Sequence, residues 1–189
     1  IDTLSNPNIF SSNPYWHLGV LSIPVTVIWI VAITNSVNLI DGLDGLACGV
    51  STISSLTMLV IALAAADPSV ALLMAALAGG CIGFLPYNLN PAKIFMGDTG
   101  SLALGGFVAG TAYMLNMPLF IPIVGLIYAV ELLSVVLQVT YFKATHGKRL
   151  FKMSPIHHHF ELCGWSETRI VAVFSIITAL LCLVALMGI

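Results

Sequence analysis

Charged side chains are scarce in this sequence of 189 residues, since Asp, Glu, Lys and Arg together make up 7% of it. A soluble domain carries roughly 25% charged residues, so the composition excludes an ordinary soluble protein. The formal net charge is −2, which excludes the basic surface that a nucleic-acid-binding protein needs. Cysteine is scarce as well: the four cysteines form no C-x-x-C pair, so neither a disulfide framework nor a zinc site is expected.

Long hydrophobic runs make up most of the chain, with 59% hydrophobic residues and a mean hydropathy of +1.04. Six of these runs are predicted to cross a bilayer as helices. They are residues 18–34, 46–66, 69–85, 101–115, 119–142 and 170–188, and residues 1–17 precede them as a loop outside the bilayer. The connections are short and no internal repeat is evident, so the sequence predicts one all-α transmembrane bundle that takes in residues 1–189.

Two of the runs contain residues that shape helices. Gly105, Gly106 and Gly110 in the fourth run predict close packing against a neighbouring helix. Pro122 and Gly125 near the start of the fifth run, which is unusually long, predict a bend there.

The basic residues fix the orientation of the predicted bundle. All six Lys and Arg residues fall in two polar connections, at residues 88–100 and 143–169. Successive connections alternate between the two sides of a membrane, so these two share a side with the polar stretch at residues 35–47. The positive-inside rule makes that side cytoplasmic. The sequence therefore predicts a multi-pass protein of the cytoplasmic membrane whose polar residues face the cytosol.

The first polar stretch has oxygen-bearing side chains at every third position: Asn35, Asn38, Asp41 and Asp44. This spacing is close to the helical period, so the side chains share one drifting face, and glycines among them permit close backbone approach. Carboxylate and amide oxygens suit Mg²⁺ or the hydroxyl and imide groups of a nucleotide. A plain turn between helices is the alternative, since Asp-Gly is a common turn pair.

The second polar stretch combines Lys93, Phe95 and Asp98 with two glycines just before the fourth run. Free N–H groups at a helix start bind phosphate oxygens, and Asp98 would hold Mg²⁺ on the same phosphates. Lys93 would add positive charge, and the ring of Phe95 offers a face on which a base can stack. The competing interpretation is a structural helix cap supplied by Thr99 or Ser101.

The third polar stretch carries three consecutive histidines, His157, His158 and His159, after a Ser-Pro pair. Ser154 and Pro155 predict a helix start, with Ser as the cap and Pro at the first helical position. Adjacent helical residues point about 100° apart, so three imidazoles cannot grip one small ion. Phosphate recognition or proton transfer is therefore favoured over a zinc site, with a solvated polar turn as the remaining alternative.

Two polar residues lie inside the fifth run, Glu131 and Gln138, about two helical turns apart on one face. An ionisable residue within a span is a functional candidate by default. A hydrogen bond from Glu131 to a neighbouring helix explains it equally well, and both interpretations stay open.

These motifs together resemble one bacterial enzyme family, the phospho-N-acetylmuramoyl-pentapeptide transferases. The matching stretches are residues 35–47, 90–101, 133–139 and 153–161, which run through most of the chain. The first two resemble polyprenyl-phosphate sugar-1-phosphate transferases more widely, whereas the histidine triplet after Ser-Pro is specific to the muramoyl-pentapeptide branch. The resemblance implies a fold of ten spans, with these six as its C-terminal part, and a homodimer.

The resemblance also implies an activity. A member of this family transfers phospho-MurNAc-pentapeptide from UDP-MurNAc-pentapeptide to undecaprenyl phosphate, giving lipid I and UMP in peptidoglycan biosynthesis. The reaction would need Mg²⁺ and a cytoplasmic active site, since a metal and fixed cations must offset charge on the diphosphate. One departure is that the family's adjacent Asp-Asp motif, with a Lys downstream, is absent here; we expect it in preceding spans.

Residue roles follow from the matching motifs. The resemblance makes Asp98 the Mg²⁺ ligand and part of the catalytic group, together with Asp41, His157, His158 and His159. The predicted substrate contacts are Asn35, Asn38, Gly42, Leu43, Asp44, Lys93, Phe95 and Gln138.

Two other function classes and one nearer relative compete with this reading. A membrane cation transporter would need ionisable groups distributed through the bilayer, yet only Glu131 lies there. A non-catalytic membrane scaffold would leave the three polar stretches unexplained. A related enzyme that transfers GlcNAc-1-phosphate from UDP-GlcNAc to a polyprenyl phosphate is the nearest alternative, and the histidine triplet argues against it.

Overall fold

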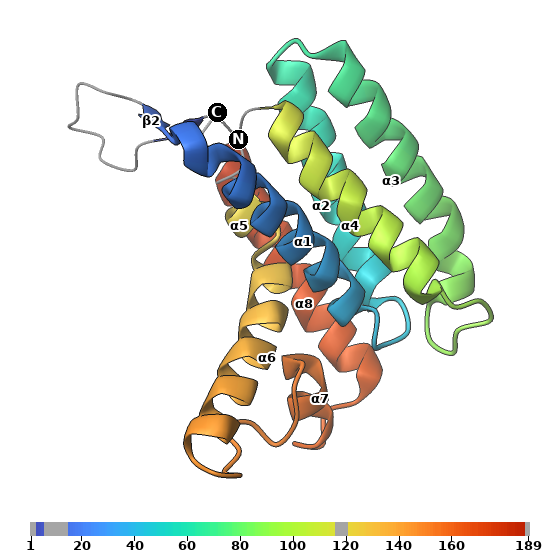
Figure 1. The fold of residues 1–189 in the computed structure, drawn as a ribbon. Helices are drawn as coiled ribbons and strands as arrows, with labels where there is room; N and C mark the ends of the chain where they lie inside the picture. Colours follow the sequence, from blue (N-terminus) through green and yellow to red (C-terminus); the bar gives the residue numbers. More distant parts are fainter. Residues whose placement is uncertain (1–2, 6–14, 116–120, 188–189) are drawn as a thin grey trace.

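The computed structural model describes residues 3–5, 15–115 and 121–187, which form a bundle of helices with a short hairpin at its start (Figure 1). The hairpin pairs β1 (Thr3–Ser5) with β2 (Tyr15–His17) in antiparallel register. The predicted loop at residues 1–17 is therefore wrong at these two strands, because backbone pairing joins them. Its other residues, and the turn predicted at residues 116–118, lie outside the described ranges.

The helices confirm the all-α prediction for the rest of the described chain. They are η1 (Gly19–Leu21), α1 (Ser22–Ile40), α2 (Leu46–Ala64), α3 (Pro68–Asn88), α4 (Gly97–Met114), α5 (Ile121–Val124), α6 (Leu126–Ala144), α7 (Ile156–Glu161) and α8 (Glu167–Leu186).

Five of the helices in the described ranges are long and apolar enough to cross a membrane: α1 with η1, α2, α3, α6 and α8. The chain is thus part of a multi-pass membrane protein, although five helices rather than the predicted six meet this standard. The predicted span that does not meet it is the fourth, which corresponds to α4 and begins at Gly97 and not at Ser101. Its added first turn contains Asp98 and Thr99, and these polar residues lower its hydropathy.

Two helix boundaries differ from the predicted runs in ways that matter for the polar stretches. Helix α1 continues to Ile40, so Asn35 and Asn38 lie on its last turns and not in a loop. The predicted fifth span is interrupted at Gly125, which separates α5 from α6, so the predicted bend is confirmed.

The core is centred on α2, whose buried face is made of small and medium side chains that pack against α3 and α8. Helix α1 packs mainly against α4 and α6. The closest approach there is at Gly105, where an added Cβ would lie 2.7 Å from the Cα of Thr34. The prediction of close glycine packing is confirmed at Gly105 but is wrong for Gly106 and Gly110, which have nothing within 4 Å of such a Cβ.

The three polar stretches meet at one end of the bundle. In Figure 1 the α1–α2 connection, the α3–α4 connection and the segment around α7 all lie at the end opposite the α2–α3 turn. That opposite turn is closed by Asp67, whose carboxylate accepts hydrogen bonds from the N–H groups of Ser69 and Val70. Segments far apart in the sequence can therefore contribute to one polar site.

Candidate active site

The first two polar stretches meet at Asp98. The Asn38 side chain, on the last turns of α1, donates hydrogen bonds to Asp98 Oδ1 at 3.1 Å and to Ser101 Oγ at 2.8 Å. Asp41, just after α1, accepts a hydrogen bond from the backbone N–H of Gly97. Burial and the nearby negative charge of Asp98 raise the pKa of Asp41 from 3.8 to about 6, although the bond from Gly97 lowers it. Two carboxylates thus oppose each other at the start of α4.

Asp44 lies in a different environment, although it is only three residues from Asp41. Its Oδ2 atom accepts hydrogen bonds from the backbone N–H of Ala92 at 2.8 Å and from the side chain of Asn90 at 3.3 Å. The same Asn90 amide donates to Glu167 Oε2 at 2.8 Å, and the backbone N–H of Asp44 donates to Glu167 Oε1. These bonds tie the first polar stretch to the second and to the first turn of α8.

The other predicted residues of the first polar stretch, Asn35, Gly42 and Leu43, make no side-chain hydrogen bond with either carboxylate cluster in the described part of the chain. Leu43 is buried in the core and Gly42 is exposed. Asn35 donates to the carbonyl of Val31 within its own helix, so the structure does not bring it to Asp98. Of the four side chains with the three-residue spacing, Asn38 and Asp41 converge on the start of α4, Asp44 joins a second cluster, and Asn35 joins neither.

The second polar stretch presents Lys93 and Phe95 at the surface. Phe95 is 73% exposed and lines one end of an apolar groove of about 550 Å³ that continues between α3 and α4 past Phe84 and Phe107. The predicted cap is wrong: α4 begins without a side-chain cap, and Ser101 lies inside it with Oγ bonded to the Gly97 carbonyl at 3.1 Å. Thr99 likewise belongs to the first turn of the helix.

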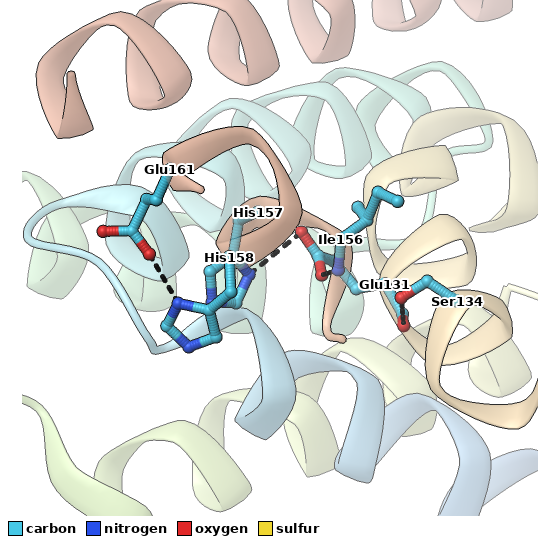
Figure 2. Close-up of polar contacts among 6 residues, drawn as sticks. All are labelled: Glu131, Ser134, Ile156, His157, His158 and Glu161. Atoms are coloured by element: carbon cyan, nitrogen blue, oxygen red, sulfur yellow. Dashed lines mark hydrogen bonds and ion pairs between the residues drawn. The ribbon is translucent and has the colours of Figure 1, made fainter. Parts of the chain in front are cut away.

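The three histidines point to three different partners. His158 Nδ1 hydrogen-bonds the Glu161 carboxylate one turn along α7, and His159 Nδ1 accepts the backbone N–H of Lys152 at 3.1 Å. His157 is fully buried, with Nδ1 3.2 Å from Glu131 Oε1 (Figure 2). The three side chains thus diverge, and in the described ranges no group of three or more His, Cys, Asp or Glu is arranged to hold a metal.

The start of α7 differs from the predicted start. Pro155 flanks the helix and Ile156 is its first residue, so Pro155 is not at the first helical position and Ser154 is not the cap. Instead, the buried carboxylate of Glu131 on α6 accepts the backbone N–H of Ile156 at 2.9 Å (Figure 2). Of the two interpretations left open for Glu131, the bond to a neighbouring helix is therefore present.

Gln138 fixes the segment before α7. Its Oε1 accepts the N–H groups of Leu150 and Phe151, and its Nε2 donates to the Phe151 carbonyl. Gln138 also borders a cavity of about 330 Å³ that Lys143 and Arg149 line. The residue thus lies beside positive charge at the same end of the bundle.

Two residues of the polar end were not predicted as site residues, Asn90 and Glu167. Asn90 precedes a proline inside the second polar stretch, and Glu167 occupies the first turn of α8, where an acidic side chain is common. Neither signal reveals a partner, because the bonds between them depend on how α3 and α8 pack.

The donors around Asp98 fit a hard divalent cation. Asp41 and Asp98 supply carboxylate oxygens, and burial together with the charge of Asp98 raises the pKa of Asp41. A magnesium ion prefers such oxygens and usually completes its coordination with water and substrate phosphate. A site with two protein carboxylates is therefore compatible with Mg²⁺ bound together with a phosphorylated substrate.

Comparison with known proteins gives a consistent family match. The model of glycosyl transferase family 4 matches residues 2–116. A phospho-N-acetylmuramoyl-pentapeptide-transferase of Clostridium botulinum (strain Eklund 17B / Type B) is 56% identical over 172 residues, which is 91% of this chain and 53% of that protein.

Two further similar proteins carry the same name. That of Clostridium kluyveri (strain ATCC 8527 / DSM 555 / NBRC 12016 / NCIMB 10680 / K1) is 53% identical over 92% of this chain and 54% of its own length. That of Clostridioides difficile (strain 630) is 53% identical, again over 92% of this chain and 54% of its own length. The chain thus spans about half the length of the curated relatives it matches.

Proposed function

The chain belongs to glycosyl transferase family 4, and we propose that it carries the catalytic face of a phospho-N-acetylmuramoyl-pentapeptide transferase. The reaction moves phospho-MurNAc-pentapeptide from UDP-MurNAc-pentapeptide to undecaprenyl phosphate, with lipid I and UMP as products. The proposal includes a cytoplasmic orientation of the polar end and assembly as a homodimer.

The observation that carries this proposal is the convergence at Asp98. Asn38, Asp41 and Asp98 come from two polar stretches separated by two helices, yet they share hydrogen bonds and charge at one helix start. That arrangement supports binding of a diphosphate together with Mg²⁺, since it offers carboxylate oxygens beside the free N–H groups of a helix N-terminus. Its position at the end of the spans suits a soluble nucleotide that meets a lipid head group.

The magnesium ion would be held by Asp98, with Asp41 beside it, and when bound it would act as a Lewis acid that offsets charge on the diphosphate. The chain's own residues do the rest. Asn38 orients the Asp98 carboxylate through its bond to Oδ1. Burial and the charge of Asp98 raise the pKa of Asp41 to about 6, and a cation between the two carboxylates would favour the ionised form of Asp41.

The uridine half of the donor is proposed to lie against Gly42, Leu43, Asp44 and Phe95, with Asn35 and Lys93 nearby. The exposed ring of Phe95 offers a stacking face. Oδ1 of Asp44 makes no hydrogen bond to other described residues, so it is available to a ligand while Oδ2 holds the second polar stretch. His157, His158, His159 and Gln138 are proposed for the phosphate and sugar side of the same site.

The ionisable residues support an enzyme over a cation transporter. Within the five candidate spans of the described ranges, Glu131 is the single acidic or basic residue away from a helix end. Its carboxylate is bonded to the N–H of Ile156 and does not continue into a chain of titratable groups across the bundle. A path for ions would need further such groups.

A transfer assay on the full-length membrane protein tests the proposal. Radiolabelled UDP-MurNAc-pentapeptide and UDP-GlcNAc are each offered with undecaprenyl phosphate and Mg²⁺, and lipid-linked product is counted. We expect product from the muramoyl donor only. Product from UDP-GlcNAc alone would identify the related GlcNAc-1-phosphate transferase, and product from neither donor would overturn the enzymatic assignment.

A further inference from the structure

The two oxygens of the buried Glu131 carboxylate contact different groups, a backbone N–H and a histidine ring. Oε2 accepts the backbone N–H of Ile156 at 2.9 Å, which holds the start of α7 against α6. Oε1 lies 3.2 Å from His157 Nδ1, and both side chains are completely buried. Figure 2 shows the carboxylate pointing at the first turn of α7, between these two groups.

His157 differs from the other two histidines because its ring is completely buried and each of the others has a ring nitrogen in a hydrogen bond. Neither ring nitrogen of His157 makes a hydrogen bond with good angles to another described residue, so the Nδ1 contact is a close charge contact. Nε2 is directed at Gly42, where an added Cβ would lie 2.4 Å away. A buried polar atom without a partner is rare in a folded protein and calls for a functional or structural reason.

The direction of the ring supplies that reason. A carboxylate beside Nδ1 favours a proton on Nδ1, and it leaves Nε2 to accept a hydrogen bond or proton from another group. The residue packed against the buried Nε2 is Gly42, in the stretch proposed for the nucleotide, and it brings no side chain to this contact. Asp41 precedes that glycine, which puts the ring next to the proposed diphosphate site.

We propose that Glu131 is the positioning residue of His157: its carboxylate sets the orientation and tautomer of the ring, so that Nε2 is the nitrogen directed at Gly42 and the proposed nucleotide site. The inference rests on the proposed function, because it gives Glu131 a part in that transfer. The polar contacts of the Glu131 carboxylate with described residues are with Ile156 and His157, at the start of α7. Its effect on the reaction therefore passes through the imidazole.

The competing explanation is that Glu131 only caps α7. Substitution by Gln separates the two jobs, because the amide oxygen still accepts the N–H of Ile156 while the amide NH₂ turns a donor toward Nδ1. Glu131→Gln thus preserves the cap and reverses the preferred tautomer. Glu131→Ala removes both interactions and leaves the buried N–H of Ile156 without an acceptor.

The experiment measures kcat and KM of the full-length enzyme for four variants: Glu131→Gln, Glu131→Ala, His157→Ala and the double variant Glu131→Gln/His157→Ala. Ser134→Ala is the matched control, since Ser134 is buried one turn along α6 and bonds only the Glu131 carbonyl. Thermal unfolding of every variant reports whether α7 is still held in place.

We expect Glu131→Gln to lower kcat by about 10- to 100-fold, the range for losing a group that orients a functional histidine, with KM nearly unchanged. Its unfolding temperature should stay close to that of the wild type, whereas Glu131→Ala should unfold at a lower temperature. In the His157→Ala background, Glu131→Gln should cause less than about a two-fold further loss, because the two changes act on one interaction. Ser134→Ala should keep its kcat.

Three results would overturn the inference while the proposed function stands. They are a wild-type kcat in Glu131→Gln, a full further loss from Glu131→Gln in the His157→Ala background, and an equal loss in Ser134→Ala. Absence of transfer by the wild type with either UDP-sugar would instead overturn the proposed function, and the inference with it.

Discussion

Two pairs of carboxylates lie at the polar end of the bundle, and they differ in the groups that surround their negative charge. Asp44 and Glu167 accept hydrogen bonds from a backbone N–H group each and share the side-chain amide of Asn90. Asp41 and Asp98 repel each other, and the repulsion adds to burial in raising the pKa of Asp41. The first pair has its partners within the protein, and the second pair has charge left for a ligand.

The comparison shows that two aspartates in the same sequence motif can have different environments in the folded protein. Asp41 and Asp44 belong to one Asp-Gly repeat, and nothing in that repeat distinguishes them. The difference arises from the groups that each one meets, which are the start of α4 for Asp41 and the Asn90 side chain with the Ala92 backbone N–H for Asp44. The following substitutions test whether the two pairs are as different in function as they are in bonding.

The largest effect is expected at the repelling pair. Asp98→Asn removes the charge proposed to hold Mg²⁺, and that charge matters most in the transition state. We expect kcat to fall by at least ~10²-fold, a loss of ~2.7 kcal/mol, with weaker activation by Mg²⁺. Initial rates against Mg²⁺ concentration measure both quantities. A variant whose KM alone changed would show that Asp98 binds substrate without holding the metal.

A smaller effect is expected at the hydrogen-bonded pair. Asp44→Asn should chiefly raise KM for the UDP-sugar and weaken UMP binding by ~1–3 kcal/mol, since nucleotide contacts are made equally in ground and transition states. Glu167→Gln is the control, because it disturbs the bonds from the Asn90 amide and from the Asp44 backbone N–H without changing the Asp44 side chain. Equal losses of UMP affinity in the two variants would mean that Asp44 acts only by holding the second polar stretch.

The helix contact that supports the repelling pair can be tested without changing any polar residue. Gly105→Ala would place a Cβ 2.7 Å from the Cα of Thr34 and so push α4 away from α1. Overpacking of this kind costs about 1–3 kcal/mol, so we expect a lower unfolding temperature and weaker Mg²⁺ activation. Gly106→Ala meets nothing within 4 Å and is the matched control. Equal unfolding temperatures for the two variants would contradict the close α1–α4 contact.

The smallest effect is a pH dependence of stability at Asp41. Its folded-state pKa of about 6 lies above the ordinary 3.8, so the folded protein binds this proton more tightly than the unfolded chain does. Protonation of Asp41 therefore stabilises the folded state. This stabilisation is fully present below the ordinary pKa and is lost as pH rises through the folded-state pKa. Thermal unfolding in EDTA across this window should show a declining stability that Asp41→Asn flattens. An unchanged slope in the variant would assign the dependence to another group.

Much of the fold could be predicted from hydrophobic runs, because a membrane span must satisfy its backbone hydrogen bonds within one helix. The polar boundaries were harder. Asn35 and Asn38 read as loop residues but extend α1, and the polar first turn of α4 was assigned to a loop. In each case tertiary contacts override local composition: the Asn38 amide has partners on α4, so a polar residue is satisfied on a helix.

The candidate site was predictable as a set of residue types but not as a set of pairs. Asp98 stood out because an acidic residue between glycines at a helix start is unusual, and the histidines because imidazole titrates near neutral pH. The partnership of Glu131 with the start of α7 depends on the packing of α6 against a segment that hydropathy reads only as polar. Ser-Pro predicted that a helix would start there, but the cap came from another helix.

The link between Glu131 and Ile156 also bears on how the protein is made. The two residues are 25 positions apart, so α6 leaves the ribosome well before the backbone group that its carboxylate bonds. At synthesis rates of 5–20 residues per second that delay is roughly one to five seconds. An acidic residue in a span disfavours insertion by up to ~2.5–3.5 kcal/mol, the value at the helix centre, and Glu131 lies in the second turn of α6. We therefore expect α6 to reach its full stability in the bilayer only after α7 has emerged and docked against it.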